Sequence, residues 1–125
     1  MVKPHIHGYY SSDVDDLSTF QGGEREDIYF PLDVYIGSTE KGGADVFQIQ
    51  IASPEAMRSR FEEQICVSGR HHLIVMDYDW KSIRSFLEEL IASCESDNWD
   101  KVTEKLARYF HWESEDYVAA QGEDL

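Results

Sequence analysis

Apolar and polar residues alternate in three stretches of this chain, which predicts β-strands because successive side chains of a strand point to opposite faces. The first stretch spans residues 2–10 and contains Pro4, which has no N–H to donate, so we expect this strand at a sheet edge. Its apolar side would consist of Val2, Pro4, Ile6 and Tyr10, and its other side of His5, His7 and Tyr9.

The other two alternating stretches, 28–36 and 44–52, are separated by the glycine-rich segment 37–43 and together predict a β-hairpin. A shift of one residue in their pairing would bury Gln48 and Gln50, so the hydrophobic pattern specifies the register. The expected inward residues are Phe30, Leu32, Val34, Ile36, Phe47, Ile49 and Ile51.

Apolar residues at steps of three and four predict three helices in the second half. Ser53 and Pro54 are typical of a helix start, and the apolar edge of this helix would be Met57, Phe61 and Ile65. Asp79 is the expected N-cap of a second helix with the stripe Trp80, Ile83, Leu87, Leu90, Ile91 and Cys94. Asn98 is the expected N-cap of a third, with the stripe Trp99, Val102, Leu106, Tyr109 and Phe110.

Between the first two helices, the continuous apolar run 72–76 (HLIVM) predicts a strand that is central or buried on both faces. The order is therefore strand, strand, strand, helix, strand, helix, helix. It predicts a single α+β domain over residues 1–125, with an antiparallel sheet of about four strands and about three helices packed mainly on one face. The long polar segment 11–27 is interpreted as a connection, with one short helical turn at Val14, Leu17 and Phe20.

The net charge of the chain limits the classes of partner that it can bind. The chain of 125 residues carries 25 acidic and 11 basic side chains, a formal net charge of −14. Such a field repels nucleic acid and anionic lipid and favours a basic partner. No apolar run approaches the ~20 residues of a membrane helix, and the N-terminus lacks a signal pattern, so we expect a cytoplasmic protein with no nucleic-acid or membrane partner.

Few residues suggest catalysis. His5 and His7 on one strand face, joined by His71 and His72, would form a zinc site only if the first and fourth strands were neighbours. Cys66 and Cys94 are expected as free thiols, with Cys94 in the core. There is no phosphate-binding glycine loop, nucleophile elbow or C-x-x-C pair, so we expect no enzyme activity, cofactor or metal. A small metal-dependent hydrolase remains an alternative.

Two acidic and aromatic groups suggest recognition instead. Asp77 and Asp79 flank Tyr78 after an apolar strand, where they are also suited to a turn and a helix cap. After Arg108 the chain has no lysine or arginine, and large aromatic residues alternate with carboxylates. Aromatic residues are enriched at interface anchors, which favours a binding surface. The expected contact residues are Asp77, Asp79, Trp112, Glu113, Glu115, Asp116 and Tyr117.

Four segments resemble immunity-protein family eight: LDVYIG (32–37), GADVFQIQIASPEAM (43–57), LIVMDYDW (73–80) and WDKVTEKLARYFHWESEDY (99–117). This family is encoded beside toxins in bacterial polymorphic toxin and contact-dependent inhibition systems. The resemblance implies a non-catalytic α+β domain that neutralises a cognate toxin by direct binding. It leaves the toxin open; a nuclease with a basic groove is one candidate. A non-catalytic adaptor subunit is a further alternative.

Overall fold

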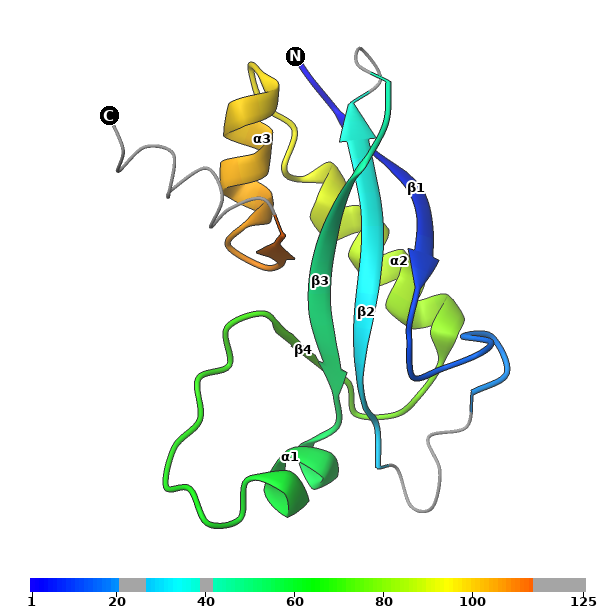
Figure 1. Cartoon of the computed structure of the whole chain (residues 1–125), viewed down its shortest axis with the longest axis vertical. Coiled ribbons are helices and arrows are strands. Elements are labelled where there is room, and N and C mark those ends of the chain that lie inside the picture. Colours follow the sequence, from blue (N-terminus) through cyan, green and yellow to red (C-terminus); the bar gives the residue numbers. More distant parts are fainter. Residues whose placement is uncertain (21–26, 39–41, 114–125) are drawn as a thin grey trace.

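A computed structural model describes residues 1–20, 27–38 and 42–113, and it has the α+β arrangement expected from the sequence (Figure 1). Five strands form one mixed, mostly antiparallel sheet, and the described chain contains three helices. In chain order the elements are β1 (Pro4–Tyr10), β2 (Tyr29–Ser38), β3 (Asp45–Ala52), α1 (Pro54–Arg60), β4 (His72–Ile74), α2 (Trp80–Ala92), α3 (Trp99–Leu106) and β5 (His111–Trp112).

The hairpin of β2 and β3 forms the middle of the sheet and confirms the predicted register, with Phe30 opposite Ile51 and Val34 opposite Phe47. β1 pairs antiparallel with β2, and the strand order is β1-β2-β3-β4. β4 pairs with β3 in the parallel direction, unlike the antiparallel sheet that we expected. A parallel neighbour requires a long crossover, and α1 with the loop that follows it provides one.

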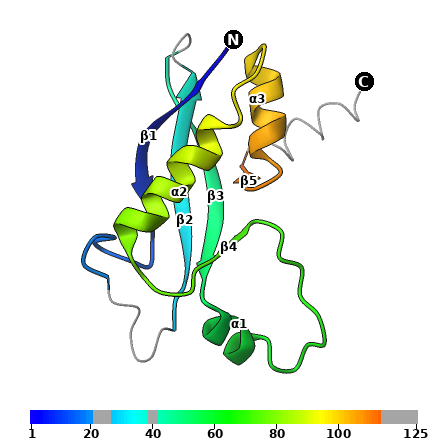
Figure 2. The ribbon, with the colours of Figure 1, turned by 180° about the vertical axis from the view of Figure 1, so that it is seen from behind.

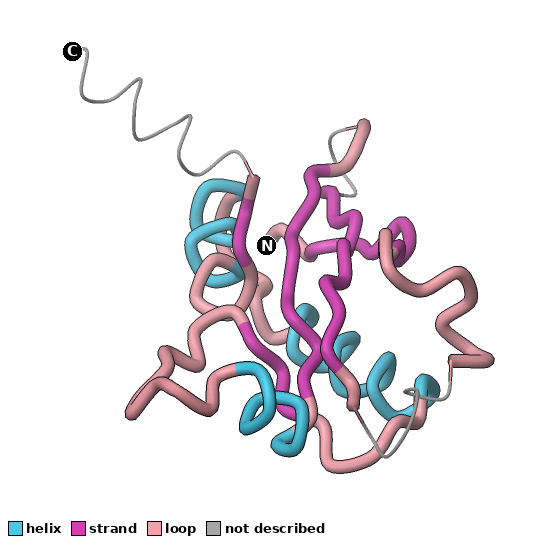
Figure 3. Tube along the Cα trace, turned by 60° about the horizontal axis from the view of Figure 1, so that its bottom comes forward, coloured by secondary structure: helices cyan, strands magenta, loops and turns pink. Residues whose placement is uncertain are grey.

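The helices lie in different places around this sheet. α2 crosses behind the sheet in Figure 1 and lies in front of it in the reversed view of Figure 2. α3 lies beside the β3 edge, above β5, whereas α1 lies at the far end of β3, near the bottom of Figure 3. The inward residues of the hairpin pack in one core with residues of α2 and α3. The helix residues in this core are Ile83, Leu87, Ile91, Val102 and Leu106.

A β-bulge in β1 reverses the predicted sides of its last residues. The pairing register with β2 shifts between Ile6 and Gly8, which adds one residue to β1. Tyr9 therefore points inward, where its ring packs edge-on against Trp80 at a centroid distance of 5.1 Å, and Tyr10 is 54% exposed. Strict alternation of sides does not hold across the bulge, so the predicted position of Tyr10 on the apolar side of the strand is wrong.

Two predicted elements are shorter than their apolar patterns suggested. α1 ends at Arg60, and Ile65, which we expected on its apolar edge, is fully exposed in the following loop. β4 spans only His72–Ile74 and pairs with β3 alone among the described strands, so it is not central. Ile74 and Met76 are exposed as a result. A short apolar run does not distinguish an edge strand from a central one.

α3 ends at Leu106, before the end of the apolar stripe that predicted it, because the hydrogen bonds that follow span three residues. The N–H groups of Arg108 and Tyr109 bond to carbonyls three residues back, which closes the final turn. Phe110 is buried, Tyr109 is 40% exposed, and the chain then enters β5. Trp112 stacks on Phe47 with ring centroids 5.9 Å apart and an interplanar angle of 10°. It is one of the partly buried residues packed on the core.

The helix cap at Ser53 connects α1 to the hairpin and gives a first prediction. The hydroxyl of this buried serine accepts hydrogen bonds from the N–H groups of Ala56 and Ile28, at 3.2 and 3.3 Å. Ser53→Ala leaves both donors without this acceptor, so we expect the free energy of unfolding to fall by about 1 to 3 kcal/mol in urea titrations. Ser59→Ala, on the exposed side of α1, should change it by less than about 0.5 kcal/mol. Equal effects of the two substitutions would contradict this role.

The stacking of Trp112 on Phe47 gives a second prediction. Trp112→Ala removes the ring that covers the β3 edge and should lower the free energy of unfolding by about 2 to 4 kcal/mol. Trp112→Phe keeps an aromatic ring and removes a buried indole N–H for which the described residues offer no acceptor, so its cost should be about 1 kcal/mol or less. An unchanged unfolding midpoint in Trp112→Ala would show that Trp112 has no packing role.

Candidate partner-binding surface

The predicted contact residues fall into two groups on different parts of the molecule. Asp77 and Asp79 lie in the turn between β4 and α2, whereas Trp112 and Glu113 lie at β5, on the other side of β3 (Figures 1 and 2). The remaining three, Glu115, Asp116 and Tyr117, lie outside the described residues. Trp112 packs against the core, whereas Glu113 is exposed. Among the described residues of the second group, Glu113 therefore supplies the negative charge.

The connection after β1 lies against the turn that carries Asp77 and Asp79. The hydroxyl of Tyr78 donates a hydrogen bond to the carbonyl of Leu17 at 2.5 Å, and the ring of Tyr78 packs edge-on against Phe20 at 4.9 Å. Phe20 in turn contacts the core residue Phe30 at 5.2 Å. These contacts hold two segments, about 60 residues apart in sequence, side by side.

This contact assembles an acidic surface from two parts of the chain. Its carboxylates are all exposed, and none makes an ion pair with a residue in the described ranges. We define the acidic surface by Asp13, Asp15, Asp16, Asp77 and Asp79. Sequence reasoning selected only the last two, because it treated the segment before residue 28 as a plain connection. The spacing of Val14, Leu17 and Phe20 was the signal that this segment packs on the core, where Val14 is buried.

In the first part of the acidic surface, local hydrogen bonds hold the carboxylate of Asp16. Asp16 accepts hydrogen bonds from the hydroxyl and the N–H of Ser18, at 2.6 and 2.9 Å, and these bonds lower the pKa of Asp16. Burial raises the pKa of Tyr78 to about 12, and the charge of Asp16 adds to the effect. At neutral pH Asp16 is therefore ionised while Tyr78 stays protonated and can donate to Leu17.

The carboxylates of the second part are fixed at the start of α2. Asp77 accepts a hydrogen bond from the N–H of Tyr78 at 2.8 Å. Asp79 occupies the N-cap position as predicted, but its carboxylate makes no bond to the helix backbone and accepts one from the hydroxyl of Ser82 instead. A negative charge there is favoured by the helix dipole, and Asp79 is exposed.

A hollow of about 370 Å³ lies within the acidic surface, between the 11–18 segment and the start of α2. Its aromatic residues are Tyr10, which is mostly exposed, and Trp80, which is partly buried. An aromatic face beside carboxylates suits a lysine or arginine side chain, because the ring quadrupole and the negative charges both attract a cation. The remaining lining residues are Ser11, Val14, Asp15, Asp16, Leu17 and Ser18.

The four histidines of the metal hypothesis are not brought together. β1, which carries His5 and His7, is the first strand of the sheet, and β4, which begins at His72, is on the other side of the hairpin. The rings of His5 and His7 are 5.0 Å apart, but His71 lies beside His111 instead. Within residues 1–20, 27–38 and 42–113, no three His, Cys, Asp or Glu side chains are arranged to hold a metal ion.

The two cysteines confirm the sequence analysis. Cys94 is buried in the core, and burial raises the pKa of its thiol, so it is a weak nucleophile there. Cys66 is exposed in the loop after α1, and both cysteines are free.

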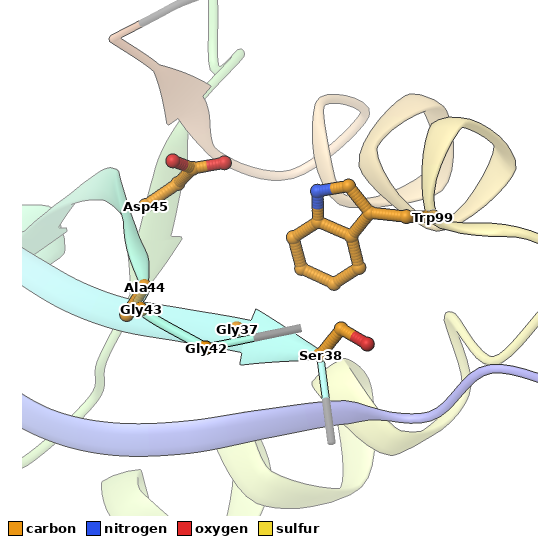
Figure 4. A pocket seen from close by; sticks show the side chains of 7 residues that line it. All are labelled: Gly37, Ser38, Gly42, Gly43, Ala44, Asp45 and Trp99. Atoms are coloured by element: carbon orange, nitrogen blue, oxygen red, sulfur yellow. The ribbon is translucent and has the colours of Figure 1, made fainter. Parts of the chain in front are cut away.

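Another hollow, of about 190 Å³, lies at the hairpin end near α3 (Figure 4). Trp99, the first residue of α3, extends over the ends of β2 and β3, and among the described lining residues Asp45 carries the carboxylate. Gly37 is required here, because an added Cβ would lie 2.3 Å from the carbonyl oxygen of Gly43. This hollow therefore reflects close packing of the hairpin end and offers little chemistry for a ligand.

Comparison with known proteins identifies the family of this chain. No helix of the described residues is long and apolar enough to cross a membrane. No curated protein and no solved structure matches the chain. The model of one family, described as Immunity protein 8, matches residues 5–117, which include β1 and the 11–18 segment as well as the later elements. The chain therefore belongs to the Immunity protein 8 family, whose members are immunity proteins directed against a toxin.

Proposed function

We propose that this protein neutralises its cognate toxin by binding it directly and covering a basic functional surface of the toxin with the acidic surface. The observation that supports this proposal is the set of five exposed carboxylates beside Tyr10 and Trp80, none of them paired with a cation of the described chain. Uncompensated charges of one sign leave the surface ready for a partner of the opposite sign. The mechanism requires no catalytic step, cofactor or metal.

Charge and aromatic contacts would have different roles in this complex. The net charge of −14 steers a basic toxin toward the protein and raises the association rate, and this effect weakens with salt. Tyr10 and Trp80 would then provide apolar contact area, which limits dissociation. A nuclease is the toxin class that fits best, because its substrate groove has to be basic to hold phosphates.

The carboxylates near the C-terminus form a second proposed contact group. Glu113 is exposed beside β5, and Glu115 and Asp116 follow it in the sequence. A toxin that reached both groups would have to extend around the β3 side of the molecule. Substituting the two groups separately distinguishes their contributions, since each can be neutralised without changing the other.

Co-expression tests the function itself. The probe is the toxin encoded beside this protein's gene, expressed in a host that the toxin alone prevents from growing. We expect this protein to restore growth and to co-purify with the toxin, because inhibition by occlusion requires a stable complex. Restored growth without a complex, or a complex that leaves the toxin active, would contradict the proposed mechanism.

Charge neutralisation tests the binding surface. In Asp13→Asn, Asp15→Asn, Asp77→Asn the side chains can still accept hydrogen bonds, but three charges of the acidic surface are lost. We expect association with the toxin to slow by about tenfold at low ionic strength and to depend less on salt, as measured by stopped-flow fluorescence. Glu113→Gln, Glu115→Gln, Asp116→Asn tests the second group in the same way.

A matched control removes the same net charge elsewhere. Glu62→Gln, Glu63→Gln, Glu104→Gln neutralises three exposed carboxylates in the loop after α1 and on α3. All three triple variants have the same net charge, so a difference between their association rates reports where the toxin binds. If the control slows association as much as the other two, the overall field and not the acidic surface directs binding.

A further inference from the structure

The outer edge of β3 is shared by two short strands with a break between them. β5 pairs with Phe47 and Gln48, and β4 pairs with the stretch from Gln50 to Ala52. Ile49 lies between the two pairings and has no strand partner on that side among the described residues. A hollow of about 260 Å³ opens at this break, with Ile49 in its lining.

The floor of this hollow is apolar and comes from three directions. Leu73 comes from β4, Phe86 and Leu90 from α2, and Tyr109 from the turn after α3. Phe86 is 53% exposed and Tyr109 is 40% exposed. Apolar side chains that converge on one hollow form a site for another apolar side chain.

The rim of the hollow carries the opposite charge to the rest of the protein. Arg70 and Arg108 both contribute to the lining, and neither makes an ion pair with any side chain in the described part of the chain. Among the described residues only Arg60, Arg84 and Lys101 are lysines or arginines with an ion pair, so what distinguishes Arg70 and Arg108 is their shared position at this hollow. Two guanidinium groups without carboxylate partners form a site for an incoming carboxylate.

One strained residue holds the two arginines on the same rim. His71 adopts a positive φ of 62°, which is uncommon for a residue with a side chain. Its Nε2 atom lies 3.2 Å from the carbonyl oxygen of Ala107, within hydrogen-bonding distance. The residue after Arg70 is thereby tied to the residue before Arg108. The rim is therefore defined by a contact between the two segments that carry its charges.

We propose that this hollow binds an acidic peptide segment of a partner protein. An aromatic or aliphatic side chain of that segment enters the hollow, and carboxylates on either side of it bond to Arg70 and Arg108. The ligand of this hollow is acidic, whereas the partner proposed for the acidic surface is basic. The hollow is thus a second binding site, and it does not depend on the toxin contact proposed above.

A peptide titration followed by NMR tests the site on the full chain without any toxin. The probe is the blocked peptide Asp-Glu-Phe-Asp-Glu, and the matched peptides are Asp-Glu-Ala-Asp-Glu and Lys-Lys-Phe-Lys-Lys. We expect saturable shifts at Leu73, Phe86 and Tyr109 with the first peptide at low ionic strength. The alanine peptide should bind about tenfold more weakly, and the lysine peptide should not shift these residues.

Variants connect the binding to the named side chains. Arg70→Gln, Arg108→Gln should weaken binding of the first peptide by about tenfold, since it removes both charge-assisted bonds. The control Arg58→Gln, Arg84→Gln removes the same charge from exposed positions outside the lining and should have a smaller effect. Phe86→Ala tests the apolar floor. Superposable amide spectra of the free variants establish that each one folds.

Several outcomes would overturn the proposal. Equal affinity for the three peptides, or equal loss in the two arginine variants, would show that no site of this chemistry exists. Shifts of residues 114–125 in free Arg70→Gln, Arg108→Gln would show that the chain's own C-terminal residues occupy the hollow. A dimer that this variant dissociates would assign the hollow to a second copy. Each of these results leaves the proposed toxin binding untouched.

Discussion

One face of the β2–β3 hairpin has to be removed from water, and the rest of the fold depends on how that is achieved. The inward residues of the hairpin are almost fully buried, and no other pair of strands in the described chain is as long. α2 covers this face, and the turn after α3 adds Phe110 and Trp112 over Phe47. The same packing positions the functional surfaces, because the start of α2 carries Asp79 and its middle carries Phe86.

Local patterns predicted the parts of the fold that depend on neighbouring residues. The hairpin register, the caps at Ser53 and Asn98 and the buried stripe of α2 follow from periods and capping chemistry within short windows. The errors have causes beyond such windows. A bulge in β1 exchanged Tyr9 and Tyr10, and the position of β4 on one side of β3 exposed Ile74. The short strand that pairs Trp112 with Phe47 was not predicted.

The candidate surfaces were predictable to different degrees for the same reason. Asp77 and Asp79 stood out because they follow an apolar strand, but Asp13, Asp15 and Asp16 join them only through the contacts of Tyr78. Arg70 and Arg108 are far apart in sequence and meet at one rim through His71 and Ala107. The acidic surface and the arginine rim are therefore each assembled by a contact between segments that are distant in sequence.

The shared edge of β3 also has a consequence for the order in which the protein is made. β4 can pair as soon as residues 72–74 have been synthesised, but β5 is the last element of the described chain. Until His111 and Trp112 leave the ribosome, the Phe47 end of β3 presents unpaired backbone groups, as any open sheet edge does. Completion of the sheet therefore waits until residues 111–112 have been synthesised, and a chain interrupted before residue 111 would retain an edge able to pair with other strands.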